Sequence, residues 1–245
     1  MDKDKLKLGD INSQKRFHQY FVENLKDRPP NTFRFFERPN NIYSVHGKEE
    51  CDFVAKIVFK SVSGVKILGF SDISSALPSH YYLTLTRKQF EEASRNILLV
   101  KNYRLELYIN NKNSWNLEYF GSPGNLTQFE DLIFSNKDGI VGTGMLSLKF
   151  QRVGNENKLG IVSVDTNNYE FLVAEFLDND FFAELESILV GLSPKECLVN
   201  STEGEFNSKI NEILERNGIL VTVLDKKIAS SKTWKSDLLQ DLRLF

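Results

Sequence analysis

The stretch that decides how this chain is organised is Gly121-Ser122-Pro123-Gly124-Asn125-Leu126-Thr127-Gln128-Phe129-Glu130-Asp131-Leu132-Ile133-Phe134. Its first residues predict a turn, because proline has no N–H to donate to a strand ladder and glycine and asparagine favour turn conformations. The apolar residues that follow, Leu126, Phe129, Leu132 and Ile133, fall on one face of a helix. The stretch therefore indicates a turn that leads into a helix.

The same stretch separates two halves of opposite charge. Up to Gly121 the chain carries 19 Lys and Arg against 14 Asp and Glu, a net of +5, and the remainder carries 12 against 19, a net of −7. We therefore expect a domain boundary here, with a tail over residues 1–14, a first domain over 15–121 and a second domain over 122–245. A basic domain beside an acidic one fits a protein that contacts DNA with one domain, although uneven solvated surfaces explain the same counts.

The composition is that of an ordinary folded protein. Hydrophobic residues make up 41% of the 245, with 19 Phe, and the six prolines form no biased tract. No apolar run approaches the roughly 18–20 residues of a membrane span, and the charged start of the chain lacks the apolar core of a signal peptide. We therefore expect an intracellular protein without a membrane partner. Cys51 and Cys197 lie in different predicted domains and are expected to be isolated buried thiols.

Apolar periodicity predicts a mixed α/β arrangement in the first half. The expected helices cover residues 16–25, 49–59 and 87–100. The expected strands cover residues 32–36, 42–46, 65–70, 81–85, 103–109 and 115–120. Pro39, Asn40 and Asn41 predict the turn between the first two strands.

The second half predicts three consecutive strands followed by alternating helices and strands. The strands are expected at residues 145–150, 158–164, 171–176, 196–199 and 219–224, and the helices at 181–190 and 206–217. Asp178 or Asp180 is expected to cap the first of these helices, and Ser236 or Asp237 to open a last one. This order is typical of a ribonuclease-H-like sheet.

Four segments carry a resemblance to a known family. Residues 122–134, SPGNLTQFEDLIF, resemble the segment that leads into the connector domain of the MutS homologue 2 branch of the MutS mismatch-repair family. The other segments are Asn102-Tyr103-Arg104-Leu105-Glu106-Leu107-Tyr108, Asp178-Asn179-Asp180 with Leu185-Glu186, and Pro194-Lys195-Glu196-Cys197. The resemblance runs with gaps from about Lys15 to Phe245. It implies a mixed-sheet α/β domain I followed by a ribonuclease-H-like connector that is truncated at its C-terminal end.

The resemblance also implies a function in DNA mismatch repair. Members of this branch are nuclear proteins that pair with a second MutS homologue, bind duplexes with a mismatch or loop, and recruit a MutL homologue. Their ATP and Mg belong to a C-terminal region, and no G-x-x-x-x-G-K-[ST] motif occurs in these 245 residues. We therefore expect neither an enzyme activity nor a cofactor in this chain.

The resemblance directs attention to residues 40–47 as a DNA-facing segment. The family reads a mispaired base with a Phe and a Glu, but Ile42 and Ser44 stand at the matching positions here, so we expect no mismatch readout. Tyr43 is a candidate for contact with the DNA backbone or a sugar, with an ordinary strand residue as the alternative. Scattered basic residues are the candidates for non-specific phosphate contact: Lys60, Lys66, Arg87 and Lys101.

The acidic second half provides the candidates for a partner-binding face, Asp178, Glu184 and Glu186, although solvated helix faces explain them equally well. Two other classes stay open: an interaction module that never contacts DNA, and a ribonuclease-H-like metal nuclease. A nuclease would use Asp165, which ends a predicted strand, together with carboxylates such as Glu186, Asp178 or Asp180. The three histidines lie in unrelated local contexts without zinc-ligand spacing, so no metal site is expected.

Overall fold

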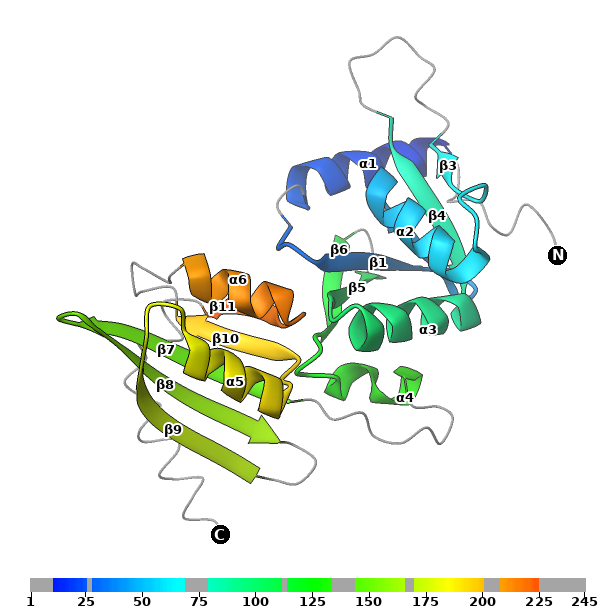
Figure 1. Cartoon of the computed structure of the whole chain (residues 1–245). Coiled ribbons are helices and arrows are strands. Elements are labelled where there is room, and N and C mark those ends of the chain that lie inside the picture. The colour runs from blue at the N-terminus through cyan, green and yellow to red at the C-terminus, as the bar shows by residue number, and fades with distance from the viewer. Residues whose placement is uncertain are drawn as a thin grey trace. The chain divides into compact units, whose positions relative to one another are not determined.

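The computed structural model describes residues 11–25, 28–68, 79–111, 114–133, 144–165, 170–200 and 208–224, with only the backbone of Ile11 and Asn200. The chain divides into two units, Met1–Gly139 and Ile140–Phe245. Each unit has its own mixed sheet with helices packed on it (Figure 1). The predicted α/β class is confirmed for both units.

The first unit contains a sheet of six strands in the order β3-β4-β2-β1-β5-β6. The strands are β1 (Thr32–Arg38), β2 (Ile42–His46), β3 (Lys66–Ile67), β4 (Tyr81–Thr86), β5 (Arg104–Asn111) and β6 (Ser114–Gly121). The helices are α1 (Ile11–Asn24), α2 (Lys48–Phe59), α3 (Arg87–Arg95) and α4 (Glu130–Ile133). Strands β1 and β5 pair in parallel, and the other neighbours are antiparallel. Of the strand predicted over 65–70, the described residues form only β3.

The two faces of this sheet differ in chemistry. Alternate residues such as Phe35, Val45 and Leu85 form an apolar core with α2 and α3. The opposite face, under α1, is aromatic and polar: Phe17 of α1 packs on Phe36 of β1 with ring centroids 5.0 Å apart. This separation follows from the period of two along a strand, which sends successive side chains to opposite faces.

Helix α3 begins as the sequence predicts and ends differently. Thr86 and Gln89 form a capping box, in which each side chain bonds the backbone of the other residue. The helix predicted to run to residue 100 changes at Asn96 into a π-helical turn, Asn96–Val100. The Lys101 N–H donates to the Asn96 carbonyl at 2.9 Å, which is the i→i+5 bond of such a turn.

The segment after Gly121 belongs to the first unit, so the domain boundary predicted at this glycine is wrong. Leu126, Phe129 and Ile133 are buried in the core formed by α2, α3 and the sheet. Gly121 makes this packing possible, because a Cβ added there would lie 2.7 Å from Cδ2 of Phe129. The turn is correctly predicted and is closed by Ser122 and Asn125, whose backbones exchange two hydrogen bonds of 3.0 Å.

The later boundary reduces the charge difference between the units. Residues 1–139 carry 20 Lys and Arg against 17 Asp and Glu, a net of +3. Residues 140–245 carry 11 against 16, a net of −5. The first unit is therefore only weakly basic, and its charge alone does not identify a nucleic-acid-binding surface.

The second unit contains five strands in the order β11-β10-β7-β8-β9. The strands are β7 (Met145–Val153), β8 (Glu156–Asp165), β9 (Glu170–Asp178), β10 (Glu196–Asn200) and β11 (Leu220–Leu224). Strands β7, β8 and β9 form an antiparallel meander, and β10 and β11 join it in parallel. Helices α5 (Ala183–Leu192) and α6 (Ser208–Arg216) pack on the same face of this sheet (Figure 1). This is the ribonuclease-H-like order that the sequence predicts; the last helix, predicted at Ser236 or Asp237, lies outside the described residues.

Each unit buries one of the two cysteines. Cys51 and Cys197 are both free and fully buried. Burial raises the pKa of both thiols, that of Cys197 to about 12. The prediction of two isolated buried thiols is confirmed. Among the described helices, none is long and apolar enough to cross a membrane.

Replacing Phe129 by Ala should destabilise the first unit and leave the second unchanged. The ring is 2% exposed, and truncating a buried Phe costs about 3–5 kcal/mol. Urea unfolding followed by hydrogen exchange at α3 and α5 separates the two units. Phe181→Ala is the control, because that ring is 78% exposed and should change stability by about 0.5 kcal/mol or less. A loss of protection at α5 in the Phe129 variant would contradict the boundary after Gly139.

Candidate DNA-facing and partner-binding surfaces

Tyr43 lies in the core and not on a surface. Its ring stacks on that of Phe90 in α3, with centroids 4.1 Å apart and an angle of 9° between the planes. The residue is 6% exposed, and its burial raises the pKa of the phenol. The suggestion that Tyr43 contacts DNA is therefore wrong for the folded chain, because the odd positions of β2 face α2 and α3.

Ser44 is also buried, but on the opposite face of β2. Its Oγ accepts a hydrogen bond from Arg38 Nε at 2.9 Å and lies 3.0 Å from Nε2 of His46. Ile42 is half-buried at the start of the strand, paired with Arg38 and Thr86. Neither residue offers an aromatic ring or a carboxylate, and Ser44 is not accessible to DNA in this fold.

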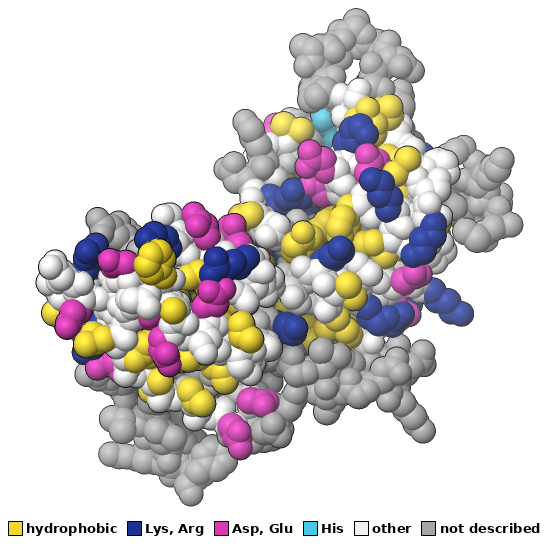
Figure 2. All heavy atoms as spheres, in the orientation of Figure 1, with side chains coloured by type: hydrophobic (Ala, Val, Ile, Leu, Met, Phe, Trp, Pro, Cys, Tyr) yellow, Lys and Arg dark blue, Asp and Glu magenta, His cyan; other side chains and the backbone are white. Residues whose placement is uncertain are grey.

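The four basic candidates are exposed but do not form one cluster. Lys60 closes α2 in the left-handed conformation, Lys66 lies in β3, Arg87 begins α3, and Lys101 follows the π-helical turn. Arg87 pairs with Glu91 at 3.0 Å. Figure 2 shows the Lys and Arg side chains dispersed over the visible face of the first unit. Such an arrangement permits only non-specific contact with phosphates.

The histidines that seemed unrelated in the sequence meet beneath α1, which corrects that interpretation. The Nδ1 atoms of His18 of α1 and His80 before β4 are 2.8 Å apart, at hydrogen-bond distance. Nδ1 of His46 of β2 lies 2.9 Å from Nε2 of His80. Arg38 of β1 completes the group, with Nη2 3.3 Å from His46 Nε2. From the sequence, only the proximity of Arg38, Ser44 and His46 could have been inferred, because the turn at residues 39–41 makes Arg38 and Ser44 diagonal neighbours on adjacent strands. His18 and His80 had none.

This histidine chain does not form a site for one metal ion. His80 uses both ring nitrogens, one toward each neighbour, and these atoms point in opposite directions. A single ion could therefore reach at most two of the three rings. No group of three His, Cys, Asp or Glu suited to a metal occurs among the described residues.

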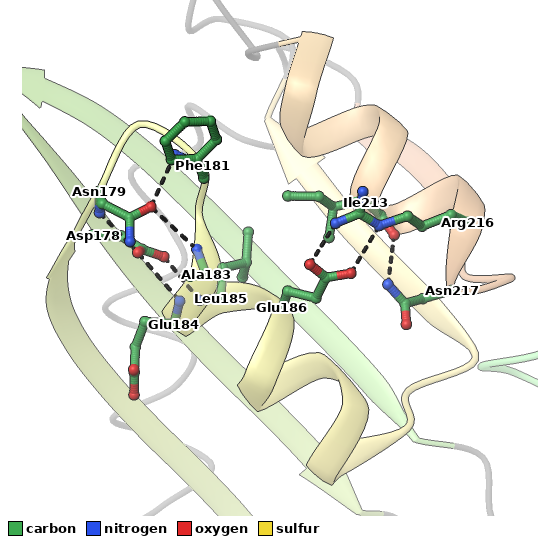
Figure 3. Close-up of polar contacts among 10 residues, drawn as sticks. All are labelled: Asp178, Asn179, Phe181, Ala183, Glu184, Leu185, Glu186, Ile213, Arg216 and Asn217. Atoms are coloured by element: carbon green, nitrogen blue, oxygen red, sulfur yellow. Dashed lines mark hydrogen bonds and ion pairs between the residues drawn. The ribbon is translucent and has the colours of Figure 1, made fainter.

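In the second unit, the loop before α5 uses its acidic and amide groups to cap the helix (Figure 3). Asp178 accepts hydrogen bonds from the backbone N–H groups of Asn179 at 2.8 Å, Glu184 at 3.2 Å and Leu185 at 2.8 Å. Asn179 Oδ1 accepts from Phe181 N–H at 2.8 Å. Asp178 is thus the predicted cap, and its carboxylate serves the fold before any partner.

Glu184 and Glu186 differ although both lie in the first turn of α5. Glu186 forms a two-pronged ion pair with Arg216 of α6, in which Arg216 Nε donates to Oε1 at 2.8 Å (Figure 3). This pair links the two helices that cover the sheet. Glu184 is exposed and points away from these contacts. Of the three acidic candidates, Glu184 is the one whose side chain is directed to the surface.

Strand β9 contributes an apolar surface that the sequence analysis missed. Phe171, Val173 and Leu177 alternate along this edge strand and are 73%, 72% and 56% exposed. The intervening Ala174 and Phe176 pack against the core under α5 and α6. Exposed apolar patches of this kind are typical of protein contact sites.

Asp165 is not part of a convergent carboxylate site. It pairs with Glu170 at one end of the β8–β9 ladder, whereas Asp178 pairs with Asn157 at the other end. Eight residue steps at about 3.3 Å separate the two ends by roughly 26 Å. Two-metal chemistry requires carboxylates within a few ångströms of one another, so the nuclease alternative with Asp165 and Asp178 is wrong.

Comparison with known proteins gives one family and several relatives. The family described as MutS domain II matches residues 144–243. "DNA mismatch repair protein spellchecker 1" of Drosophila melanogaster is 42% identical over 234 residues, covering 95% of this chain and 24% of the relative. "DNA mismatch repair protein MSH2" is 31% identical over 237 residues in Arabidopsis thaliana and 27% over 241 in Saccharomyces cerevisiae, each covering 95% of this chain and 24% of the relative. The chain therefore spans about a quarter of the length of these relatives.

Replacing Asp178 by Ala should destabilise the second unit, since three backbone N–H groups lose their acceptor. We expect a loss of about 1–2 kcal/mol in the free energy of unfolding, as for a strong helix cap. Denaturant unfolding followed by exchange at α5 measures it. Glu184→Ala is the matched control and should stay within about 0.5 kcal/mol of the wild type. Equal effects of the two substitutions would show that the capping geometry does not stabilise the unit.

Proposed function

We propose that the chain belongs to the MSH2-type branch of the MutS family of DNA mismatch repair proteins, and that it supplies the DNA-contacting and connector parts of a mismatch-sensing subunit. The observation that carries this proposal is the 42% identity over 234 residues to a DNA mismatch repair protein. That match extends over both units and not only over the MutS domain II match at residues 144–243.

The first unit would contact DNA without reading a mismatch. Ser44 is buried and bonded by Arg38, and Ile42 has no π face on which a base could stack. The exposed cations Lys60, Lys66 and Lys101 offer contacts to phosphates, and such contacts give salt-dependent affinity without sequence preference. A subunit of this kind would act with a second MutS homologue that reads the lesion.

The second unit would serve as the connector to protein partners. Its exposed apolar strand β9 and the exposed carboxylate of Glu184 provide a mixed surface for a MutL homologue or for another part of the same complex. Asp178 and Glu186, by contrast, are engaged within the fold. We infer that partner binding depends on the strand more than on these two acidic residues.

The proposed role assigns no reaction to these 245 residues. The ATP and Mg chemistry of the family would belong to a part of the protein outside them, since no G-x-x-x-x-G-K-[ST] motif occurs here. A repair function on genomic DNA implies that the protein works in the nucleus.

Duplex binding by this chain tests the proposal. Fluorescence anisotropy with matched and singly mismatched duplexes, at about 50 and about 200 mM salt, should give equal affinities that fall with salt. Replacing Lys60, Lys66, Arg87 and Lys101 together by Ala should lower the salt slope by about 0.9 for each phosphate that the variant no longer neutralises.

The control variant removes four basic residues from the second unit, Lys149, Arg152, Lys158 and Lys195, and should keep the wild-type slope. A preference for the mismatched duplex would contradict the proposed absence of readout. Absence of salt-dependent binding would identify the chain as an interaction module and overturn the DNA-contacting half of the proposal.

A further inference from the structure

The histidine chain beneath α1 contains all three histidines of the protein. Each is buried, at 5%, 3% and 6% exposure for His18, His46 and His80. The chain joins three elements, since His18 lies on α1, His46 on β2, and His80 directly before β4. Because Arg38 contacts one end of this histidine chain, the ring nitrogen that carries the proton can be assigned for each histidine.

Arg38 fixes the tautomer of each ring in turn. A guanidinium only donates, so His46 Nε2, 3.3 Å from Arg38 Nη2, accepts; the Ser44 hydroxyl, which accepts from Arg38 Nε and lies 3.0 Å from the same nitrogen, directs its own proton to it. His46 then carries its proton on Nδ1 and donates to His80 Nε2, 2.9 Å away. His80 in turn carries its proton on Nδ1 and donates to His18 Nδ1 at 2.8 Å. Neutral His18 therefore has its proton on Nε2.

An additional proton cannot enter this chain without breaking a hydrogen bond. Each of the two N···N contacts holds one proton, and His46 Nε2 faces a permanent donor in Arg38. Protonating His18 or His80 would place two N–H groups against each other. Moving the proton of a neighbouring ring to its other nitrogen places two N–H groups against each other at the next contact. Repeating this step ends with an N–H of His46 facing Arg38.

Helix α1 rests on the same rings. Phe17 packs on His46 with centroids 4.5 Å apart, and Phe21 packs on His80 at 5.1 Å. The Arg38 guanidinium lies between the rings of Phe17 and Trp115, at 4.2 and 4.5 Å from their centroids. A new cation here would be desolvated beside an existing one, so the docking of α1 depends on neutral histidines.

We propose that His18, His80 and His46 form a proton-sensitive latch, which holds α1 on the first sheet while all three rings are neutral and releases the helix when one gains a proton. The released helix, of 14 residues, would not persist by itself, because isolated helices of about 12–15 residues are marginal in water. Release would uncover Ser44 and His46 on β2.

The surroundings of the rings support this proposal. Burial lowers the pKa of all three histidines, that of His80 to about 4, with Arg38 and the neighbouring rings adding to the effect for His46 and His80. The phenol of Tyr82 on β4 is another titratable group beside the rings, with its ring centroid 6.3 Å from that of His46. A cavity of about 360 Å³ beside His46 is lined by further charged groups: Arg28, Arg34 and Glu50. Arg28 pairs with Glu50, and Arg34 with Glu106.

The sign of the effect follows from proton uptake. The released form has an ordinary histidine pKa of about 6.5 and binds protons that the docked form rejects, so docking weakens as the pH falls from about 6.5 toward about 4. With a docked pKa of about 4 for His80, moving from about pH 7.5 to about pH 5 should shift the docking equilibrium roughly 30-fold toward release.

Hydrogen exchange of the whole 245-residue chain tests the latch. After correction for intrinsic rates, protection of α1 should fall at least about tenfold between about pH 7.5 and about pH 5, while α2 of the same unit stays protected. In the triple variant His18→Gln, His46→Gln, His80→Gln, which lacks all three titrating rings, the protection of α1 should change less than about twofold.

A second measurement keeps the proposal open to contradiction even if that variant folds poorly. Nitrogen-15 spectra of the wild-type histidine rings near pH 7.5 should show Nδ1–H for His46 and His80 and Nε2–H for His18. Another set of tautomers, constant protection of α1 at the lower pH, or parallel loss of protection in α1 and α2 would each overturn the latch.

Discussion

Residue parity along the strands of the first sheet is the constraint on which its chemistry depends. Because side chains alternate between faces, the odd residues of β2 complete the apolar core, and the even residues meet Arg38 and α1. The five residues of this strand therefore contribute to two different environments, the apolar core and the polar face under α1, and the residues suited to one are not suited to the other. A shift of one residue in both strands of the β1–β2 hairpin would place Arg38 among the apolar side chains of the core and Tyr43 on the polar face under α1.

The second unit shows why acidic residues are poor indicators of a binding surface. Asp178, Glu184 and Glu186 are close in sequence and alike in charge, but one caps a helix, one points to the surface, and one pairs with Arg216. Their roles are decided by the direction of each side chain around the start of α5. By contrast, Phe171, Val173 and Leu177 of β9 are exposed because they lie on the face of the sheet opposite to the one that α5 and α6 cover, in a strand with a neighbour on only one side.

The local elements were predictable from the sequence, and the long-range contacts were not. Alternation and the turn at residues 39–41 were enough to predict β2, and three strands before alternating elements predicted the order of the second sheet. Gly121 marked a turn correctly but not a boundary, because burial of Phe129 depends on space that only the folded unit provides. The meeting of His18 with His80 joins residues 62 positions apart, and no local pattern reports such a contact.

Each unit of the chain contains one buried cysteine whose reactivity reports whether that unit is folded. Cys51 and Cys197 lie in separate cores, and thiol reagents attack the thiolate, which burial suppresses at both positions. Alkylation of either sulfur therefore requires the surrounding core to open. Because the two sulfurs lie in different units, the alkylated peptide identifies the unit whose core opened. The intact protein therefore reports the opening of each unit separately, without any engineered label.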